Sequence, residues 1–461
     1  MKIISSISGL RATLVEGNFD NLLVYKYISA ICKLFPSGLL LIGRDGRPSG
    51  LEIEEFIART LNYFKRDYIL LGLVPTPTVQ LIVEELGATV GISITASHNP
   101  AEWNGLKFIN SNGIFLNAEE NKLLLEIISE QNIKQIPDAI QFGEDLTITY
   151  KNKLAIEKHI KKILDLRLDG IKLDIDEIKS KKFKVSVDAI NSSGSFIIPE
   201  LLKELGCEVN KINCNGDGEF VHQPEPLPEN LSELAYKVAS SNSDIGFAID
   251  PDGDRLVIIN EKGNAIKEEF TIVLSIWAYL ELCKNPREVS IVVNHSTTQL
   301  VEIIAERFGA KVHRSPVGEI NVVEKMKAIN AQIGGEGSGG VILRDFHLGR
   351  DAIAGIVLIL LLLARKEKKI SEIIEELPTT IMKKVKLDFE DDFEKMIKLT
   401  IPQFKKEKCI QEDGVKFIGP EYWVQLRKSN TEPILRIIAE SNTEFSTNVL
   451  IDKIFGIIKN I

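Results

Sequence analysis

Hydrophobic residues with helical spacing end at a glycine and lead into a β-branched stretch at three places in the chain. These places are VQLIVEELGATV at residues 79–90, IPELLKELGCEV at 198–209 and LVEIIAERFGAKV at 300–312. A glycine at the end of a helix adopts the left-handed conformation that other residues avoid. The β-branched residues that follow favour a strand. The pattern therefore predicts three helix–glycine–strand units.

A second pattern comes before each unit: a strand-like apolar run followed by a loop of small residues. It occurs in LLLIGRDGRPSG at residues 39–50, FKVSVDAINSSG at 183–194 and VSIVVNHSTTQ at 289–299. The complete units lie too far apart for the short repeats of a solenoid. They are typical of three α/β domains of related topology.

The chain changes character after the third unit. Residues 379–461 contain four strand-like segments with a helical segment on either side. We therefore expect an α/β protein with three related α/β domains, built on mixed sheets, at residues 1–150, 151–255 and 256–378. A C-terminal α+β domain follows at residues 379–461. A length of 461 residues is enough for several separate cores.

Composition narrows the functional class. The chain is 44% hydrophobic and 26% charged, with a net charge of −9, and no basic stripe indicates nucleic-acid binding. The longest apolar run, residues 352–364, is shorter than the ~20 residues of a membrane span. Five widely spaced cysteines without a Cys-x-x-Cys pair indicate reduced thiols. We expect a cytoplasmic protein, monomer or homodimer, with no nucleic-acid or membrane partner.

The first loop with candidate chemistry is TASHNP, which follows a strand-like run at residues 92–94. Pro100 stops regular structure, so Ser97 and His98 are expected at an exposed strand end. A serine hydroxyl can carry a phosphoryl group. His98 and Lys107 would supply cations to that phosphate. The alternative is an ordinary Ser/Asn/Pro turn.

The second loop places three carboxylates in one turn. Asp250, Asp252 and Asp254 follow another strand-like run and would repel one another unless a cation lies among them. Arg255 is then placed to meet a phosphate oxygen. An EF-hand would need glycine where Arg255 stands, and helices on both sides. A haloacid-type nucleophile at Asp250, or a solvated acidic turn, could also account for this spacing.

Two further loops carry groups that suit a sugar phosphate. Residues 334–342 hold Glu336 and Ser338 between glycines, an acceptor and a donor for sugar hydroxyls. Residues 427–436 combine two arginines with hydroxyl and amide groups, a set that suits phosphate binding. The members of this second set are Arg427, Ser429, Asn430, Thr431 and Arg436. A glycine-rich turn and a polar hairpin are the simpler interpretations of these two loops.

Together the four loops, through TASHNP, DPDGDR, GGEGSGG and SNTEP, resemble those of the α-D-phosphohexomutase superfamily in order and spacing. The resemblance implies four domains arranged in a heart shape around one central cleft, with one loop from each. It implies that Ser97 is a phosphoserine and that Mg²⁺ is held by Ser97, Asp250, Asp252 and Asp254. It further implies that a hexose 1,6-bisphosphate activates the enzyme by phosphorylating Ser97.

The same resemblance assigns the remaining site residues. Arg255, Glu336 and Ser338 would bind the substrate, and the five residues of the fourth loop would hold the distal phosphate. Lys107 and Arg11 would take part in proton transfer beside Ser97 and His98. A desolvated lysine among cations can have a lowered pKa, which would suit Lys107 to act as a general base or acid.

Two positions depart from the family. The superfamily often has histidine where this chain has Gly340, and glycine where it has Ala12. His347 could either supply the missing contact or be structural. The variant GGEGSGG with HLGRDA and WNGLK resembles phosphoglucosamine mutases more than glucose or mannose enzymes. The sequence thus predicts a hexose 1-phosphate/6-phosphate mutase. The competing hypotheses are phosphoglucomutase/phosphomannomutase, a Mg²⁺-dependent sugar phosphatase and a silent sugar-phosphate sensor.

Overall fold

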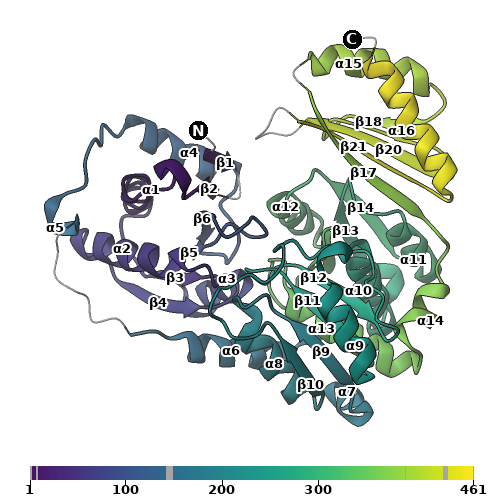
Figure 1. Ribbon diagram of the computed structural model, residues 1–461, viewed down its shortest axis with the longest axis horizontal. Coiled ribbons are helices and arrows are strands. Elements are labelled where there is room, and N and C mark those ends of the chain that lie inside the picture. The colour runs from purple at the N-terminus through teal and green to yellow at the C-terminus, as the bar shows by residue number, and fades with distance from the viewer. Residues whose placement is uncertain (1–2, 7–8, 142–148, 390, 429–433, 460–461) are drawn as a thin grey trace.

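A computed structural model describes residues 3–6, 9–141, 149–389, 391–428 and 434–459. Four sheets of four or more strands follow one another along the chain, from the purple N-terminal domain to the yellow C-terminal one (Figure 1). The first sheet has the order β1-β2-β6-β5-β3-β4. Its strands are β1 (Ile3–Ser6), β2 (Gly9–Thr13), β3 (Leu40–Arg44), β4 (Tyr68–Leu73), β5 (Val90–Ile94) and β6 (Trp103–Asn110).

The second and third sheets repeat the central part of the first. Their orders are β10-β9-β11-β12 and β14-β13-β15-β16, and in each the first three strands are parallel and the fourth is antiparallel. The strands are β9 (Lys184–Asp188), β10 (Glu208–Ile212), β11 (Ile245–Ile249), β12 (Leu256–Asn260), β13 (Ser290–Asn294), β14 (Lys311–Ser315), β15 (Ile333–Glu336) and β16 (Gly340–Leu343). In the first sheet, β4, β3, β5 and β6 pair in the same way.

Helices cover these sheets and connect the domains. The first domain contains α1 (Asn21–Leu34), α2 (Ser49–Tyr63), α3 (Thr76–Leu86), α4 (Ala118–Glu130) and α5 (Asp138–Gln141). The connection and the second domain contain α6 (Asn152–Leu164), α7 (Ile175–Lys181), α8 (Gly194–Glu204) and α9 (Ser232–Ser241), with the small hairpin β7 (Arg167–Leu168) and β8 (Ile171–Lys172). The third domain contains α10 (Glu269–Leu282), α11 (Leu300–Phe308), α12 (Glu319–Ile329), α13 (Ala352–Lys366) and α14 (Ile370–Glu375).

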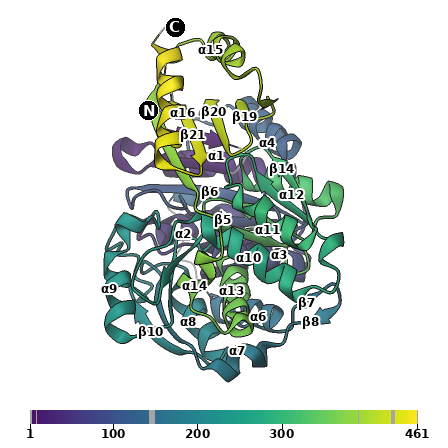
Figure 2. The same ribbon diagram turned by 90° about the vertical axis from the view of Figure 1, so that its right-hand side faces the viewer.

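The C-terminal domain is built differently, as its sequence pattern predicts. Its five strands are antiparallel in the order β17-β21-β20-β19-β18. They are β17 (Ile381–Asp388), β18 (Lys408–Ile410), β19 (Val415–Ile418), β20 (Tyr422–Lys428) and β21 (Ile434–Ser441), packed with α15 (Phe393–Thr400) and α16 (Glu444–Ile458). Figure 2 shows this domain standing at one end of the molecule, above the green third domain.

The predicted helix–glycine–strand units are present. Gly87 and Gly309 end α3 and α11 with φ of 59° and 73°, in the left-handed region that favours glycine. The apolar run after Asp351 forms α13, whose residues 352–364 are all buried. Among the described residues, no helix is long and apolar enough to cross a membrane. The five cysteines are free thiols, and Cys32, Cys207 and Cys283 are buried.

The first three domains each present one loop from an equivalent place in their sheets. In the first three domains this loop joins the third parallel strand to the antiparallel strand: β5 to β6, β11 to β12 and β15 to β16. The loop of the C-terminal domain joins β20 to β21. The expected boundary after residue 255 falls inside the β11–β12 hairpin, because β12 is an edge strand of the second sheet. We therefore propose that the second domain continues through β12.

A buried polar network ties the first domain to the third. His159 on α6 contacts Thr78 Oγ1 through Nδ1 at 2.8 Å and Asp351 Oδ2 through Nε2 at 2.8 Å. His347 Nε2 contacts the same oxygen at 2.9 Å. Asp351 also accepts the N–H of Ile353 and so caps α13. His347 is thus structural, and the contact that it could have supplied beside Gly340 is not made by it.

We expect this network to lose stability in mild acid. The pKa of His347 is lowered from its ordinary 6.5, because burial outweighs the hydrogen bond with Asp351. Below that value the unfolded chain takes up a proton that the folded protein does not, so stability is lost as pH falls. The wild-type protein should lose unfolding free energy between about pH 7.5 and about pH 5.5. In His347→Asn this loss should be smaller by about 1 kcal/mol, as measured by urea denaturation at the two pH values.

His222 provides a control of opposite sign. Burial lowers the pKa of His222, but the hydrogen bond to Asp188 and the charge of Asp188 raise it by more, so that the pKa lies above 6.5. Its stabilising contribution is present below pH 6.5 and is lost as pH rises through the folded pKa. His222→Asn should therefore cost more stability at the lower pH. A His347→Asn protein with the wild-type pH dependence would contradict the expectation.

Candidate active site

The TASHNP loop and the acidic loop meet in the structure. Ser97 follows β5 and has a left-handed backbone with φ of 53°, a strained conformation for a residue other than glycine. Its N–H donates to Thr95 Oγ1 at 2.8 Å. Its Oγ lies 3.4 Å from Asp250 Oδ2 and 3.4 Å from His98 Nδ1. The two loops, which lie far apart in the chain, therefore bring a hydroxyl next to a carboxylate cluster.

Arg47 holds the serine loop in place, and sequence reasoning missed it. The side chain is fully buried and its Nε donates to Asp45 Oδ2 at 3.0 Å, while Thr95 Oγ1 donates to the same oxygen at 2.6 Å. The guanidinium donates to four loop carbonyls, those of Ser97, Asn99, Pro100 and Trp103. Such a fork fixes a loop backbone better than a single ammonium could. The Asp-Gly-Arg spacing in GRDGRPSG was the available signal.

Carbonyl oxygens of the acidic loop accept hydrogen bonds from the first domain, from its own domain and from the third domain. Thr76 N–H donates to the carbonyl of Asp252 at 2.9 Å, and the hydroxyls of Ser192 and Ser193 donate to that of Pro251 at 2.6 and 2.7 Å. The elements on either side are the strands β11 and β12, so an EF-hand is excluded. The loop is therefore held rigidly where three domains meet.

The three aspartates could hold a metal ion. One carboxylate oxygen from each of Asp250, Asp252 and Asp254 lies within 4.8 Å of the others, and all three residues are buried. Burial and the charges of Asp254 and Asp252 raise the pKa of Asp250 well above its ordinary value. Within the described residues, Asp252 Oδ1 and Asp254 Oδ1 are buried without a hydrogen-bond partner. Buried oxygens of this kind, crowded together, fit a hard divalent cation.

Lys107 does not have the lowered pKa that we expected. Its Nζ lies 2.6 Å from Asp252 Oδ2 and 3.3 Å from Asp254 Oδ2. Burial lowers the pKa of the ammonium, but these two carboxylates outweigh burial and raise the pKa above its ordinary value. The prediction failed because it counted the cations around Lys107 and not the aspartates. Lys107 is a cation that partly neutralises the acidic loop.

His98 also differs from the expected cation. Its pKa is lowered well below 6.5 by burial and by the charges of Arg255 and Arg11, so the imidazole is neutral near pH 7. Arg255 Nη1 donates to Glu225 Oε1 at 3.2 Å, and Arg11 Nη1 donates to Asn99 Oδ1 at 3.3 Å. The positive charge beside Ser97 therefore comes from the two arginines.

The glycine-rich loop packs directly on the acidic loop. Gly339 has φ of 93°, and a Cβ there would lie 2.4 Å from the carbonyl oxygen of Leu256. Glu336 Oε1 accepts Asn294 Nδ2 at 2.8 Å and the N–H of Gly318 at 2.9 Å. Ser338 is half-buried beside it. Ala12, the other departure from the family, is buried in β2 opposite Asn104.

In the fourth loop the structure brings two arginines side by side. Arg427 on β20 is paired directly with Arg436 on β21, so both side chains lie on one face of the sheet. Arg427 Nε donates to Asp413 Oδ1 at 2.8 Å. Two guanidinium groups opposite each other repel, which favours an anion near them. The predicted residues Ser429, Asn430 and Thr431 lie outside the described residues.

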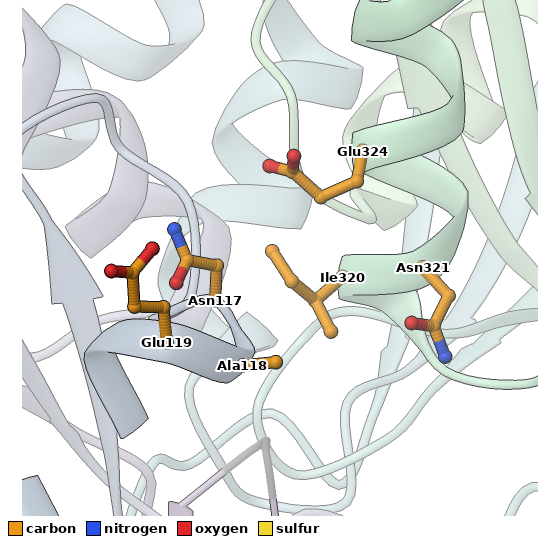
Figure 3. Close-up of a pocket in the computed structure, with 6 residues that line it drawn as sticks. All are labelled: Asn117, Ala118, Glu119, Ile320, Asn321 and Glu324. Atoms are coloured by element: carbon orange, nitrogen blue, oxygen red, sulfur yellow. The ribbon is translucent and has the colours of Figure 1, made fainter. Parts of the chain in front are cut away.

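A pocket of about 300 Å³ lies between the first and third domains (Figure 3). It is lined by Asn117, Ala118 and Glu119 at the start of α4 and by Ile320, Asn321 and Glu324 on α12. This lining contains two glutamates and no basic residue. The pocket therefore does not suit a phosphate group.

Comparisons with known proteins agree with this geometry. The chain matches the family models for α/β/α domains I, II and III of phosphoglucomutase/phosphomannomutase. The matches cover residues 3–134, 157–263 and 269–381. A phosphoglucomutase/phosphomannomutase of Thermococcus kodakarensis is 36% identical over 411 residues, which is 88% of this chain and 86% of that protein. The chain belongs to the phosphoglucomutase/phosphomannomutase family. It is thus a phosphohexomutase, an isomerase of the α-D-phosphohexomutase superfamily, as predicted.

Further relatives extend the comparison over the whole chain. A phosphoglucosamine/phosphogalactosamine mutase of Sulfurisphaera tokodaii is 32% identical over 95% of each chain. A solved phosphoglucomutase/phosphomannomutase family protein of Burkholderia thailandensis has a TM-score of 0.81 at 23% identity, over 99% of this chain and 98% of that one. The N-acetylphosphoglucosamine mutase of Aspergillus fumigatus, solved with GlcNAc-6P and magnesium, has a TM-score of 0.60 at 14% identity, over 100% and 96%. The predicted fold of this phosphohexomutase is confirmed, including its C-terminal domain.

We expect the acidic loop to bind a divalent cation and Asp250 to limit the stability of the metal-free protein. Asp250→Asn removes one of three crowded charges, so the melting temperature in a chelator should rise. The same change removes a charged ligand, so cation affinity, measured by calorimetry, should fall on the order of 10-fold or more.

The exposed Asp176 provides the control, because its pair with Lys179 lies at the surface. Asp176→Asn should leave both the melting temperature and the cation affinity as in wild type. A metal-free Asp250→Asn protein that is less stable than wild type and binds the cation equally well would contradict the assignment.

Proposed function

We propose that this phosphohexomutase interconverts the 1- and 6-phosphates of a hexosamine through a phosphorylated Ser97, with one Mg²⁺ ion at the acidic loop. The observation that supports this most directly is the position of Ser97 Oγ. It lies 3.4 Å from Asp250 Oδ2, in a buried site that also contains the cations of Lys107, Arg11 and Arg255. A hydroxyl placed between a carboxylate cluster and arginines suits the transfer of a phosphoryl group.

The reaction needs two phosphoryl transfers of opposite direction. In the first, the bond between phosphorus and Ser97 Oγ breaks while the free hydroxyl oxygen of the sugar phosphate forms a bond to the same phosphorus. The hydroxyl proton leaves to a base, and the serine oxygen regains a proton. The bisphosphate then turns end for end and returns its other phosphoryl group to Ser97 by the reverse step. A hexose 1,6-bisphosphate from solution would load Ser97 in the same way.

Each loop has a part in this scheme. Neutral His98, with Nδ1 at 3.4 Å, is placed to exchange a proton with Ser97 Oγ. Arg255 and Arg11 stabilise the charge on the phosphoryl group, and Lys107 balances the acidic loop. Glu336 and Ser338 would bind the sugar hydroxyls. Ser429, Asn430 and Thr431, with the paired Arg427 and Arg436, would hold the phosphate at the other end of the sugar, whichever end that is.

The residues present fit Mg²⁺. Asp252 Oδ1 and Asp254 Oδ1 are buried oxygens without a hydrogen-bond partner in the part of the chain that the structure describes. Asp250 offers a third carboxylate, and Ser97 lies beside them. Hard oxygen ligands of this kind, completed by a phosphate oxygen, are typical of Mg²⁺ sites in phosphoryl-transfer enzymes. When bound, the ion would neutralise negative charge on the transferring group.

The preference for a hexosamine phosphate rests on relatives. Several of them are named phosphoglucosamine mutase, including those of Methanococcus vannielii and Methanococcus maripaludis, and the Sulfurisphaera tokodaii relative carries an amino-sugar name as well. The Thermococcus kodakarensis relative, named for glucose and mannose phosphates, supports the competing hypothesis. We retain phosphoglucomutase/phosphomannomutase as the second candidate.

Removal of the hydroxyl should abolish the phosphoenzyme. Ser97→Ala should incorporate no label from glucose 1,6-bisphosphate carrying ³²P, and its mutase kcat should fall by about 10⁴-fold or more, because no nucleophile remains. Ser111, an exposed turn residue, is the control, and Ser111→Ala should be labelled as wild type. Labelling or turnover of Ser97→Ala at the wild-type level would refute the phosphoserine. A labelled protein that releases phosphate without isomerising the sugar would indicate a phosphatase.

The amino-sugar preference is tested by direct competition of substrates. We expect kcat/KM for glucosamine 1-phosphate to exceed those for glucose 1-phosphate and mannose 1-phosphate by about 10-fold, a difference of about 1.4 kcal/mol in transition-state binding. The measurement uses phosphorylated enzyme with saturating Mg²⁺. Equal values for the three sugars, or a preference for glucose or mannose, would favour the second candidate. Tight binding of sugar phosphate with no turnover would favour the sensor.

A further inference from the structure

The segment between β16 and α13 folds back onto the sugar loop. The N–H of Asp351 donates to the carbonyl of Val341 at 2.8 Å, and the N–H of Ala352 donates to that of Gly253 at 3.3 Å. These bonds place the preceding residue, Arg350, between the glycine-rich loop and the acidic loop. Its side chain is 10% exposed.

One guanidinium there joins two loops of the active site and the start of α12. Arg350 Nη2 donates to Asp254 Oδ2 at 2.6 Å, and Nη1 donates to Glu336 Oε2 at 2.8 Å and Ser338 Oγ at 3.4 Å. Its Nε donates to Glu319 Oε2 at 3.0 Å, at the start of α12. The planar fork of arginine can make these bonds together, whereas the single ammonium of a lysine cannot reach all of them.

Arg350 occupies the space that a side chain at position 340 would need. A Cβ added to Gly340 would lie 2.3 Å from Arg350 Cδ and 2.9 Å from its Cγ. The backbone of Gly340 itself is not in the left-handed region, so it could accept another residue if that space were free. Gly340 and Arg350 therefore form one feature: the glycine is required because the arginine is present.

The two oxygens of Asp254 differ in their hydrogen bonds. Oδ2 receives Arg350 Nη2 and Lys107 Nζ, while Oδ1 is buried without a hydrogen-bond partner among the described residues. Arg350 thus holds this carboxylate with one oxygen left for a cation. Glu336 differs, because both of its oxygens accept hydrogen bonds: Oε2 from Arg350, and Oε1 from Asn294 and Gly318.

We propose that Arg350 is a positioning residue that uses the space above Gly340 and keeps the metal-binding and sugar-binding carboxylates in register. This inference rests on the proposed function for its catalytic consequence. Arg350 acts through Asp254 and Glu336. Without it, two buried carboxylates of the site and Glu319 would lose their shared cation, and no side chain in the described part of the chain would link Asp254 to Glu336.

The test is an exchange of the two residues. Arg350→Lys and Arg350→Ala should lower kcat by on the order of 10- to 100-fold with a smaller change in KM, and should weaken Mg²⁺ binding, measured by calorimetry, several-fold. Gly340→His should have a similar effect, because the imidazole displaces Arg350. The double variant Gly340→His/Arg350→Ala should recover at least about 10-fold in kcat over Arg350→Ala, since each change relieves the other.

Arg344 provides the matched control. It lies in the same segment and is paired with Asp345 and Asp169 at the surface, so Arg344→Ala should keep kcat and Mg²⁺ affinity within about 2-fold of wild type. Melting temperatures of all variants show which are folded. Arg350→Lys with wild-type kcat and Mg²⁺ affinity, or a double variant whose losses equal the product of the single ones, would overturn the proposal.

The outcomes separate this inference from the proposed function. If wild-type enzyme neither incorporates label at Ser97 nor isomerises any hexose phosphate, the proposed function fails. The calorimetric Mg²⁺ affinities and the melting temperatures of the single and double variants still test whether Gly340 and Arg350 act as a pair that holds Asp254. If wild type is labelled and active while these variants show no coupling, the role of Arg350 alone is wrong.

Discussion

Repulsion among the buried carboxylates of the acidic loop is the constraint on which this active site depends. Asp250, Asp252 and Asp254 lie in one turn without access to water, so their charges must be balanced by groups brought from elsewhere. Lys107 comes from the first domain and Arg350 from the third, and each makes a direct ion pair with Asp254. The turn therefore holds the domains together electrostatically, and a bound cation would strengthen this effect.

The architecture explains how four distant segments can meet. Three domains place their functional loop at the turn after the third parallel strand, where the chain reverses into an antiparallel edge strand. Loops at the carboxyl ends of such strands are free to carry binding groups, because the sheet alone fixes their ends. Glycines in the third loop allow it to approach the second to within van der Waals contact. The repeated topology thus brings the serine loop, the acidic loop and the glycine-rich loop together at one site.

The sequence allowed the elements and most of the chemistry to be predicted, but not the balance of charge. The helix–glycine–strand pattern and the aspartate spacing are both local. The first predicted the elements correctly, and the second predicted the crowded carboxylates that the structure brings together, a group that could hold a metal ion. The pKa of Lys107 and the charge of His98 depend on which residues of other domains face them, and no local pattern encodes that. Arg350 was missed for the same reason, because it acts on loops that are distant in sequence. Arg47 was missed although its spacing from Asp45 offered a local signal.

The segment that follows Gly340 in the chain determines what fills the space beside this glycine. His347 was the nearest histidine in sequence, yet its Nε2 is committed to Asp351 in the network that caps α13. The adjacent Arg350 faces the opposite way, into the site, because the backbone bonds of Asp351 and Ala352 fix the direction of the segment. In this segment Asp351 caps α13, and the residue before it, Arg350, supplies a cation to the active site. The Arg350 side chain fills the space where a side chain at position 340 would lie. Glycine is therefore the residue that fits at this position while Arg350 is present.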